Sequence, residues 1–419
     1  MITIGRPYIE EREEGAFLIA SVKDDVRQRE MEVWYSVNKE YGGYLCDKLA
    51  DAFLLLVLQL GMSTGQDIKV EAPVSARLLF NLENTVQPLF AKALPGFQHI
   101  KIEAAAETET LYKGMGVGCC CSLGVDSFSS FLKHFSSDVI EGYRVTHLTL
   151  FNSGQLGYED IAGAENKFYE TVRSLKPFAD EVGLPIVAVN SNLNSLFLDS
   201  GLTILHTFVN RTLSCAMALQ PLFGKYVFSS SYSVEQFEMS EVDESHMESA
   251  YVPLFSTNNM EIILSNPGMT RVEKTKFLSQ FPITTKYLDV CWASQMAYGK
   301  WKDAGLKLLE GKTKRNCGRC NKCLRTMFTL DLLGRLEAYE GQFHTEYYKA
   351  HKDEYMAKVL VNKGDNIFYE ELKELISSTG YKPSSKVRHK IFFIKHPYIE
   401  KVYKKTRKVI KRLSKKINA

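Results

Sequence analysis

The chain has 419 residues, of which 45% are apolar and 24% charged, and this composition is that of a folded protein with more than one domain. The segment from Met1 to Glu14 is charged, and the longest apolar run, Ala52–Leu58, is far shorter than the about 20 residues that span a bilayer. These features predict neither a signal peptide nor a membrane span. Without an export signal, the nine cysteines indicate a reducing cytoplasm and a metal site rather than disulfides.

Charge is distributed unevenly along the chain, although the net charge is only +3. Residues 386–419 hold 13 of the 52 Lys and Arg but only one of the 49 acidic residues, Glu400, so this tail carries +12 and the remainder −9. An acidic body does not predict a nucleic-acid-binding surface. Apolar residues in the tail recur at spacings of three and four, which predicts a basic amphipathic helix suited to an anionic membrane surface or an acidic partner. A tail that is merely solvated, or one that contacts RNA, is the alternative.

Residues 1–108 are predicted to form a small α+β domain. Strands are expected at 14–22 and 29–37, then a helix near 44–60, a short strand at 68–71 and a second helix near 75–93. The apolar run in the first helix indicates that this helix is buried in the core. We recognise no catalytic combination of residues in this segment.

From residue 109 onward the pattern alternates between strand and helix, which predicts an α/β fold with a parallel, doubly wound sheet. Strands are expected at 115–121, 146–151, 185–189 and 226–230, and helices near 126–136, 159–182 and 204–222. Such sheets bind ligands at the carboxyl ends of their strands. A helix near 270–280 and a cysteine cluster complete a predicted domain over 109–330. A helical extension over 331–385 and the basic tail over 386–419 follow.

The run Cys121-Ser-Leu-Gly-Val-Asp-Ser127 joins the first of these strands to the first helix. A strand that turns into a helix at small residues points several backbone N–H groups at one place, and the helix dipole favours an anion there. The run therefore predicts a phosphate-binding loop. The alternative is an ordinary turn in which Ser122 or Ser127 caps the helix. The run lacks the Gly-Lys-Ser/Thr of a Walker A loop.

Cys317, Cys320 and Cys323 form two overlapping Cys-x-x-Cys spacings in one glycine-containing turn. Three thiolates so close together predict a metal site, because tetrahedral Zn²⁺ takes four such ligands. Cys291, in Tyr287-Leu-Asp-Val-Cys-Trp292, is the expected fourth ligand. Zinc is the favoured metal; an iron–sulfur cluster would suit the same spacing, and free thiols are the remaining alternative.

The loop resembles the Ser-Gly-Gly-x-Asp-Ser motif of the PP-loop ATP pyrophosphatases. Ser122, Gly124, Asp126 and Ser127 match that motif, whereas Leu123 stands where the family has its first glycine and enters positive φ only at a cost. Together with the cysteine cluster, the loop makes residues 109–330 resemble the 7-cyano-7-deazaguanine synthase-like proteins. Ser229–Glu238 does not match the substrate loop of that family, and the N-terminal segment and the tail are additions.

The resemblance implies a HUP-type fold that binds ATP, Mg²⁺ and a structural Zn²⁺. ATP would lie on Ser122, Leu123, Gly124, Val125, Asp126 and Ser127, with Asn152 near the adenine or ribose. Asp126, Arg271 and Lys274 would be catalytic, the two cations by neutralising charge on phosphorus. Thr270 and Glu273 could equally be the capping box of an ordinary helix. The predicted acceptor is an oxygen of a small molecule or glycan precursor, adenylated for nitrogen transfer.

Two other functions stay open at this point. Leu123 would suit a degenerate loop that binds nucleotide without catalysis, and related loops transfer sulfur to tRNA. Cys119, Cys120 and Cys121 are interpreted as small buried hydrophobes rather than sulfur carriers, and lone histidines such as His206 and His246 are more often structural than catalytic. We expect a cytoplasmic enzyme that makes peripheral contact with the inner membrane face through its tail.

Overall fold

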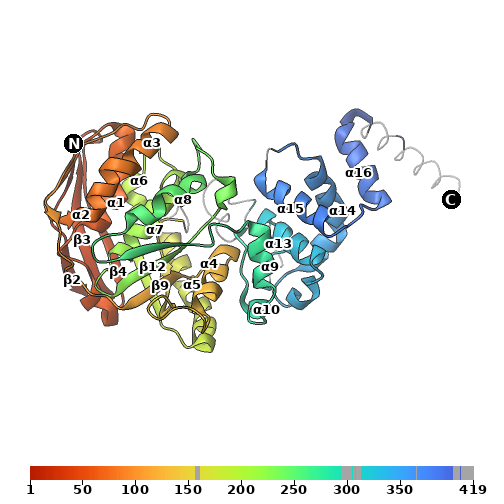
Figure 1. The fold of residues 1–419 in the computed structure, drawn as a ribbon, viewed down its shortest axis with the longest axis horizontal. Helices are drawn as coiled ribbons and strands as arrows, with labels where there is room; N and C mark the ends of the chain where they lie inside the picture. The colour runs from red at the N-terminus through yellow and green to blue at the C-terminus, as the bar shows by residue number, and fades with distance from the viewer. Residues whose placement is uncertain are drawn as a thin grey trace. The chain divides into compact units, whose positions relative to one another are not determined.

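The computed structural model describes residues 1–155, 161–293, 313–364 and 366–399, together with Ala304, Lys307 and Thr406. The chain forms two compact units: Met1–Met269 with Tyr287–Glu310, and Thr270–Lys286 with Gly311–Ala419 (Figure 1). Beyond Ile399 the predicted amphipathic helix lies outside the described residues, apart from Thr406. Among the helices described, none is long and apolar enough to cross a membrane.

The first unit is built on a mostly parallel sheet of eleven strands, counted within the described residues. Its path runs β13-β12-β9-β10-β11-β4-β3-β1-β5-β7, and β2 pairs with β3. The strands are β1 (Ile2–Ile4), β2 (Tyr8–Arg12), β3 (Gly15–Asp24), β4 (Arg29–Val37), β5 (Ile68–Val70), β7 (Ile102–Glu103), β9 (Gly116–Cys120), β10 (His147–Phe151), β11 (Ile186–Ser191), β12 (Phe223–Ser229) and β13 (Glu261–Ser265). β6 (Val74–Ser75) and β8 (Ala106–Glu107) form a separate pair.

The five strands β13-β12-β9-β10-β11 are all parallel, which confirms the α/β sheet predicted for this segment. In sequence order they read 5-4-1-2-3, so the direction of the connections reverses beside β9. Because crossovers are right-handed, α4 (Val125–Phe135) and α5 (Ile161–Val182) lie on one face and α7 (Ile204–Met217) on the other (Figure 1). Phe128 of α4 meets Phe178 of α5 edge-on, with ring centroids 5.2 Å apart. A reversal of this kind is where doubly wound sheets bind ligands.

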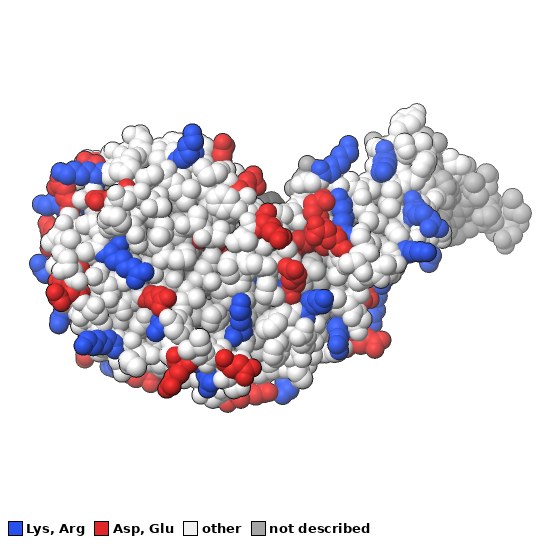
Figure 2. All heavy atoms as spheres, in the orientation of Figure 1, with Lys and Arg blue, Asp and Glu red and all other residues white. Residues whose placement is uncertain are grey.

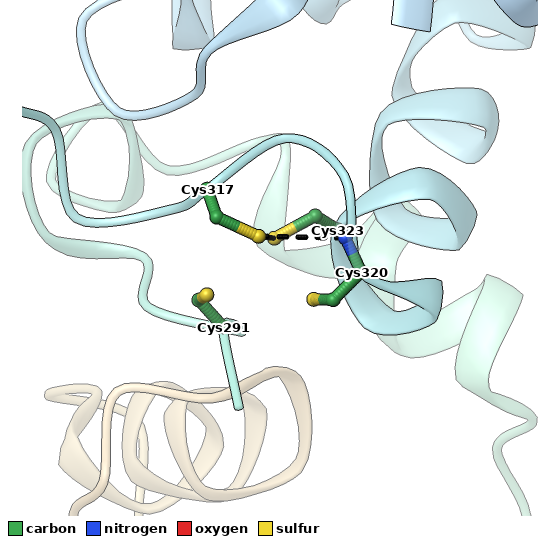
Figure 3. A group of neighbouring side chains, drawn as sticks. All are labelled: Cys291, Cys317, Cys320 and Cys323. Carbon is green, nitrogen blue, oxygen red and sulfur yellow. Dashed lines mark hydrogen bonds between the residues drawn. The ribbon is translucent and has the colours of Figure 1, made fainter. Parts of the chain in front are cut away.

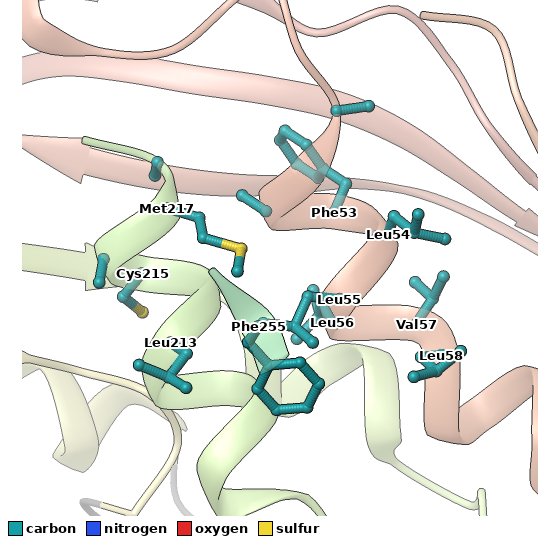
Figure 4. Close-up of a cluster of buried hydrophobic side chains, with 14 of the residues drawn as sticks. Phe53, Leu54, Leu55, Leu56, Val57, Leu58, Leu213, Cys215, Met217 and Phe255 are labelled. Carbon is teal, nitrogen blue, oxygen red and sulfur yellow. The ribbon is translucent and has the colours of Figure 1, made fainter. Parts of the chain in front are cut away.

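Helix α1 (Asp51–Thr64) is the centre of the core, as its apolar run predicts. Every residue from Asp51 to Met62 is buried, and a helix that is apolar on all sides requires such a position. Figure 4 shows this cluster, in which α1 faces α7 and a nearby 3₁₀ turn; it includes Phe53, Leu54, Leu55, Leu56, Val57, Leu58, Leu213, Cys215, Met217 and Phe255. The buried Asp51 accepts hydrogen bonds from the N–H and hydroxyl of Ser75.

The remaining helices of the first unit are shorter. They are α2 (Ala76–Asn81), α3 (Gln87–Ala93), α6 (Leu193–Phe197) and α8 (Glu248–Tyr251), with 3₁₀ turns at Lys39–Tyr44, Val234–Gln236, Glu244–Met247 and Val252–Phe255. The helix expected near 75–93 contains a π-helical turn at Leu82–Val86. The helix expected near 44–60 begins only at Asp51, after a 3₁₀ turn.

The second unit is helical. Its elements are α9 (Arg271–Leu278), α10 (Thr284–Tyr287), α13 (Asn321–Leu332), a 3₁₀ turn at Leu336–Tyr339, α14 (Thr345–Val361), α15 (Ile367–Ser378) and α16 (Ser385–Lys395). Aromatic rings join three of them, because Tyr355 of α14 meets Phe328 of α13 at 5.3 Å and Tyr369 of α15 at 6.0 Å. The connection between α15 and α16 ends at Ser384, beside the predicted start of the basic tail at 386.

The predicted division at 108, 330 and 385 follows composition and motifs, and it stays a prediction. By its contacts the chain forms two compact units. Strands β3 and β4, from the first 108 residues, belong to the same sheet as β9–β13, because β4 pairs with β11 in antiparallel register at Ser36 and Asn190.

Candidate phosphate loop and metal centre

The loop 121–124 leaves the carboxyl end of β9 and leads directly into α4. β9 is flanked by β10 and β12, so the loop lies at the reversal of the sheet. Gly124 is the N-cap residue of α4 and supplies no side chain to cap it. The first N–H groups of the helix, at Val125, Asp126 and Ser127, point away from its body and carry the positive end of its dipole. This arrangement can receive an anion.

Two hydroxyl groups fasten the loop. Ser122 Oγ and Ser127 Oγ are 2.9 Å apart, and the N–H of Gly124 reaches Ser122 Oγ at 3.4 Å. Ser127 is buried, whereas Ser122 is exposed and Asp126 is partly exposed. The two hydroxyls and the N–H of Gly124 therefore lie together, and the Asp126 carboxylate in the first turn of α4 could hold a divalent cation.

Leu123 has φ +59°, the left-handed conformation that glycine adopts without cost. The side chain is only 3% exposed, and the carbonyl accepts a hydrogen bond from the N–H of Asp289 at 2.9 Å. A leucine in this region costs about 1–2 kcal/mol. The loop thus has a glycine-like backbone at the position where the family motif has glycine, and the neighbouring contacts stabilise it.

A small polar cavity lies at the carboxyl ends of β10 and β11. It is lined by Trp34, Asn152, Gly154, Ala164, Glu165, Asn190, Ser191, Asn192 and Asn194. Asn152 Nδ2 donates to Asn190 Oδ1 at 2.8 Å, and Asn190 Nδ2 donates to Glu165 Oε1 at 3.0 Å. Asn152 is therefore held by an amide network that fixes which of its polar atoms face the cavity.

Most of the cavity residues were not predicted. The run Asn190-Ser-Asn-Leu-Asn194 directly after an apolar strand is a signal that could have identified them, since polar residues there line the ligand edge of a parallel sheet. Trp34 could not be identified in this way, because it comes from β4, far away in the sequence. Gly154 has φ +96°, and a Cβ there would stand 2.2 Å from Asn194 Oδ1.

The four predicted metal ligands come together. The sulfur atoms of Cys291, Cys317, Cys320 and Cys323 all lie within 4.8 Å of one another, and Figure 3 shows their side chains converging. Cys317 Sγ and Cys323 Sγ are 3.9 Å apart. Thiolates at about 2.3 Å from a tetrahedral zinc are separated by roughly 3.8 Å, whereas a disulfide requires about 2.05 Å. This four-cysteine group could therefore hold a metal ion, and its geometry fits zinc.

The local fold explains why these cysteines converge. Gly318 has φ +69°, and a Cβ there would stand 1.8 Å from the carbonyl oxygen of His344. This turn directs the N–H groups of Arg319 and Cys320 to Cys317 Sγ, each at 3.4 Å. Cys320 is the N-cap residue of α13 and Cys323 lies in its first turn, where the helix dipole stabilises thiolate.

The predicted cations Arg271 and Lys274 lie in the first turn of α9, in the second unit. The capping box is present, since Thr270 Oγ1 accepts from the N–H of Glu273 and Glu273 Oε2 accepts from the N–H of Thr270. Arg271 lies over the ring of Phe368 at 5.6 Å, and Lys274 is buried. The structural role of this motif is confirmed, whereas the role of the two cations in charge neutralisation stays a prediction.

The cysteines of β9 and the two histidines considered in the sequence analysis have contacts of a structural kind. Burial raises the pKa of Cys120 to about 11 and that of Cys119 further, so both thiols are protonated and behave as small apolar groups. His206 Nδ1 accepts a hydrogen bond from the N–H of Thr203 and completes the capping box of α7. His246 stacks on Tyr232 at 3.8 Å.

On the face that Figure 2 shows, Lys and Arg side chains are interspersed with Asp and Glu side chains. The chain matches no protein-family model, no curated protein and no solved structure.

Proposed function

We propose that this protein is an ATP-dependent enzyme of the PP-loop type, with the HUP arrangement of strands, that adenylates an oxygen of its substrate and releases pyrophosphate. The observation that carries the proposal is the loop at the end of β9, with its left-handed Leu123 and paired hydroxyls at the reversal of a parallel sheet. The four-cysteine group supports it, because the PP-loop relatives that the sequence resembles carry a structural zinc.

The chemistry would proceed in two displacements. A substrate carboxylate oxygen would bond to the α-phosphorus of ATP while the bond to the bridging α–β oxygen breaks, and pyrophosphate leaves. Ammonia or an amine would then attack the activated carbonyl carbon, AMP would leave, and the nitrogen would lose a proton. Adenylation makes a poor leaving oxygen a good one, and preorganised donors stabilise the charge that develops.

The residues at the start of α4 and of α9, together with Asn152, have separate parts in this proposal. The N–H groups of Val125, Asp126 and Ser127 would bind phosphate oxygens, and the Asp126 carboxylate would hold Mg²⁺. Arg271 and Lys274 are proposed to neutralise charge on phosphorus. Asn152 would contact the base or ribose at the polar cavity, which it lines.

The experiment compares Asp126→Asn with Asp138→Asn in ATP titrations and in assays for AMP with ammonium and carboxylate mixtures. Both variants remove one negative charge, one at the start of α4 and the other on an exposed residue just beyond its end. We expect AMP formation to fall at least 100-fold in Asp126→Asn and to stay unchanged in Asp138→Asn, since removing one preorganised charge typically costs about this much. Full AMP turnover by Asp126→Asn would contradict the role of the loop.

Two other outcomes would favour the alternative functions. Calorimetric binding of ATP with no AMP under any condition would indicate a nucleotide-binding protein without catalysis. A thiolated tRNA nucleoside whose formation depends on this protein would indicate sulfur transfer, although the protonated thiols of Cys119 and Cys120 do not favour it.

We also propose a cytoplasmic location with peripheral contact to an anionic membrane through the tail. Four apolar side chains near the end of the described chain are exposed, namely Phe392 (45%), Ile394 (40%), Tyr398 (78%) and Ile399 (45%). Aromatic and aliphatic groups among lysines suit the membrane interface, and each basic residue near it contributes roughly 1 kcal/mol. A tail that binds nucleic acid would need the basic residues but not these exposed apolar side chains.

The membrane proposal is tested by co-sedimentation with vesicles containing phosphatidylserine or only phosphatidylcholine. Val387 of α16 is buried, so a truncation that removes 396–419 keeps the packed part of the helix. We expect the full chain to bind only anionic vesicles. The truncated chain keeps Phe392 and Ile394 but loses nine of the 13 basic residues of the tail, so we expect it to bind these vesicles much more weakly. Equal binding by both chains would refute the proposal.

A further inference from the structure

We propose that Asp289 is a positioning residue that ties the phosphate loop to the metal centre, so that a metal held by Cys291 keeps the loop in its binding conformation. The inference rests on the proposed function for the nature of the ligand, but not for the coupling itself. It concerns residues 289–291, which end at Cys291 and contact the loop in space. The sequence did not indicate a role for Asp289.

The first link is the contact between Asp289 and the loop. The N–H of Asp289 donates to the carbonyl of Leu123 at 2.9 Å. The backbone of Asp289 also passes Gly124, since a Cβ at Gly124 would be 3.7 Å from the Asp289 carbonyl oxygen. Asp289 therefore lies along the two residues whose backbone shape defines the loop.

The second link is the left-handed conformation of Leu123. A non-glycine residue keeps such a conformation only where its surroundings over-determine it. At Leu123 these surroundings are a buried side chain and the hydrogen bond from Asp289. If the bond is lost, the leucine can relax to negative φ, and the N–H groups at the start of α4 lose their common direction.

The third link runs from Asp289 to the cysteine group. Asp289 Oδ1 accepts a hydrogen bond from the N–H of Cys291 at 3.4 Å, and the sulfur of Cys291 belongs to the four-cysteine group. A metal bound to that sulfur fixes a residue only two positions from Asp289. Removing the metal releases the segment 289–291 and with it the bond that holds Leu123.

The test measures hydrogen exchange of peptides covering 121–128 in the full-length protein, loaded with zinc or stripped by a chelator, without nucleotide. We expect exchange in this loop to rise about 5- to 30-fold on stripping, which is the cost of left-handed leucine converted at 1.4 kcal/mol per tenfold. Peptides from β10 serve as the internal reference and are expected to change little. An unchanged loop, or an equal rise in β10, would overturn the proposal.

Two variants separate the proposed links. Leu123→Gly removes the cost of the left-handed conformation, so the loop is expected to lose most of its dependence on metal. In the zinc-loaded protein, Asp289→Ala is expected to raise exchange in the loop and Asp289→Asn, which keeps an acceptor oxygen, to restore it. If hydrogen exchange in the loop depends on metal as strongly in Leu123→Gly as in the natural protein, the second link is contradicted. If exchange is equal in Asp289→Ala and Asp289→Asn, the third link is contradicted.

Binding of inorganic pyrophosphate provides a second measurement. We expect the stripped protein to bind it about 5- to 30-fold more weakly than the zinc-loaded protein. Because hydrogen exchange requires no nucleotide, the coupling can be established even if AMP formation is never observed, and the two failures are distinguishable. Equal pyrophosphate affinity in both states would refute the consequence for ligand binding.

Discussion

Replacing Gly318 with alanine is expected to disrupt the metal centre, and Gly334 provides a matched control. Both glycines have nearly the same backbone conformation, with φ +69° and +67°. An added Cβ at Gly318 would stand 1.8 Å from the backbone oxygen of His344, whereas nothing lies within 4 Å of one at Gly334. The two substitutions share the conformational penalty and differ in the collision.

The size of each effect follows from these geometries. Alanine in the left-handed region costs about 1–2 kcal/mol, which is the whole effect expected at Gly334. At Gly318 the backbone must also move, and overpacking adds about 1–3 kcal/mol, so the sum is about 2–5 kcal/mol. Expressed as metal affinity, this is a loss of roughly 30-fold to several thousand-fold for Gly318→Ala.

The assay is competition between the protein and a chelator of known zinc affinity, with metal content measured after equilibration. Gly334 follows α13 and is not part of the cysteine turn, so Gly334→Ala is expected to lower the thermal midpoint and leave zinc affinity within about threefold. Equal zinc affinity in Gly318→Ala and the natural protein would refute the argument that this turn positions Cys317.

Three further predictions concern the first unit. Burial raises the pKa of Glu244 from 4.5 to about 8, so its contribution to stability is complete below pH 4.5 and is lost as the pH rises toward 8. The thermal midpoint of Glu244→Gln is therefore expected to depend less on pH than that of the natural protein. An unchanged pH dependence would contradict this. Leu56→Ala, in fully buried α1, is expected to cost about 2–5 kcal/mol in denaturant unfolding, and a loss below about 1 kcal/mol would indicate that the site is not core. An added Cβ at Gly154 would stand 2.2 Å from Asn194 Oδ1, so Gly154→Ala is expected to displace this cavity-lining side chain and weaken ATP binding by at least about tenfold in calorimetry. Gly201→Ala, which meets no atom within 4 Å, is the control, and equal affinities would show that the cavity does not take part in nucleotide binding.

The metal ligands and the loop were the parts of the candidate site that the sequence predicted most directly. Cys317, Cys320 and Cys323 are close in sequence, so a single turn must bring their sulfurs together whatever the rest of the chain does. The phosphate loop is likewise one continuous segment between a strand and a helix. The left-handed backbone at Leu123 could not be predicted in the same way, because its cost is offset by a hydrogen bond from Asp289, which is distant in sequence.

The sequence by itself determined the alternation of strands and helices, the buried α1 and the local groups of ligands, because these depend on periodicity and short spacings. Only the tertiary structure decided that β4 extends the parallel strands through an antiparallel pairing with β11, and that Trp34 therefore lines the cavity beside Asn152 and Asn190. Pairings between strands so far apart in the chain depend on which edges meet after folding. Composition and periodicity do not indicate which edges will meet.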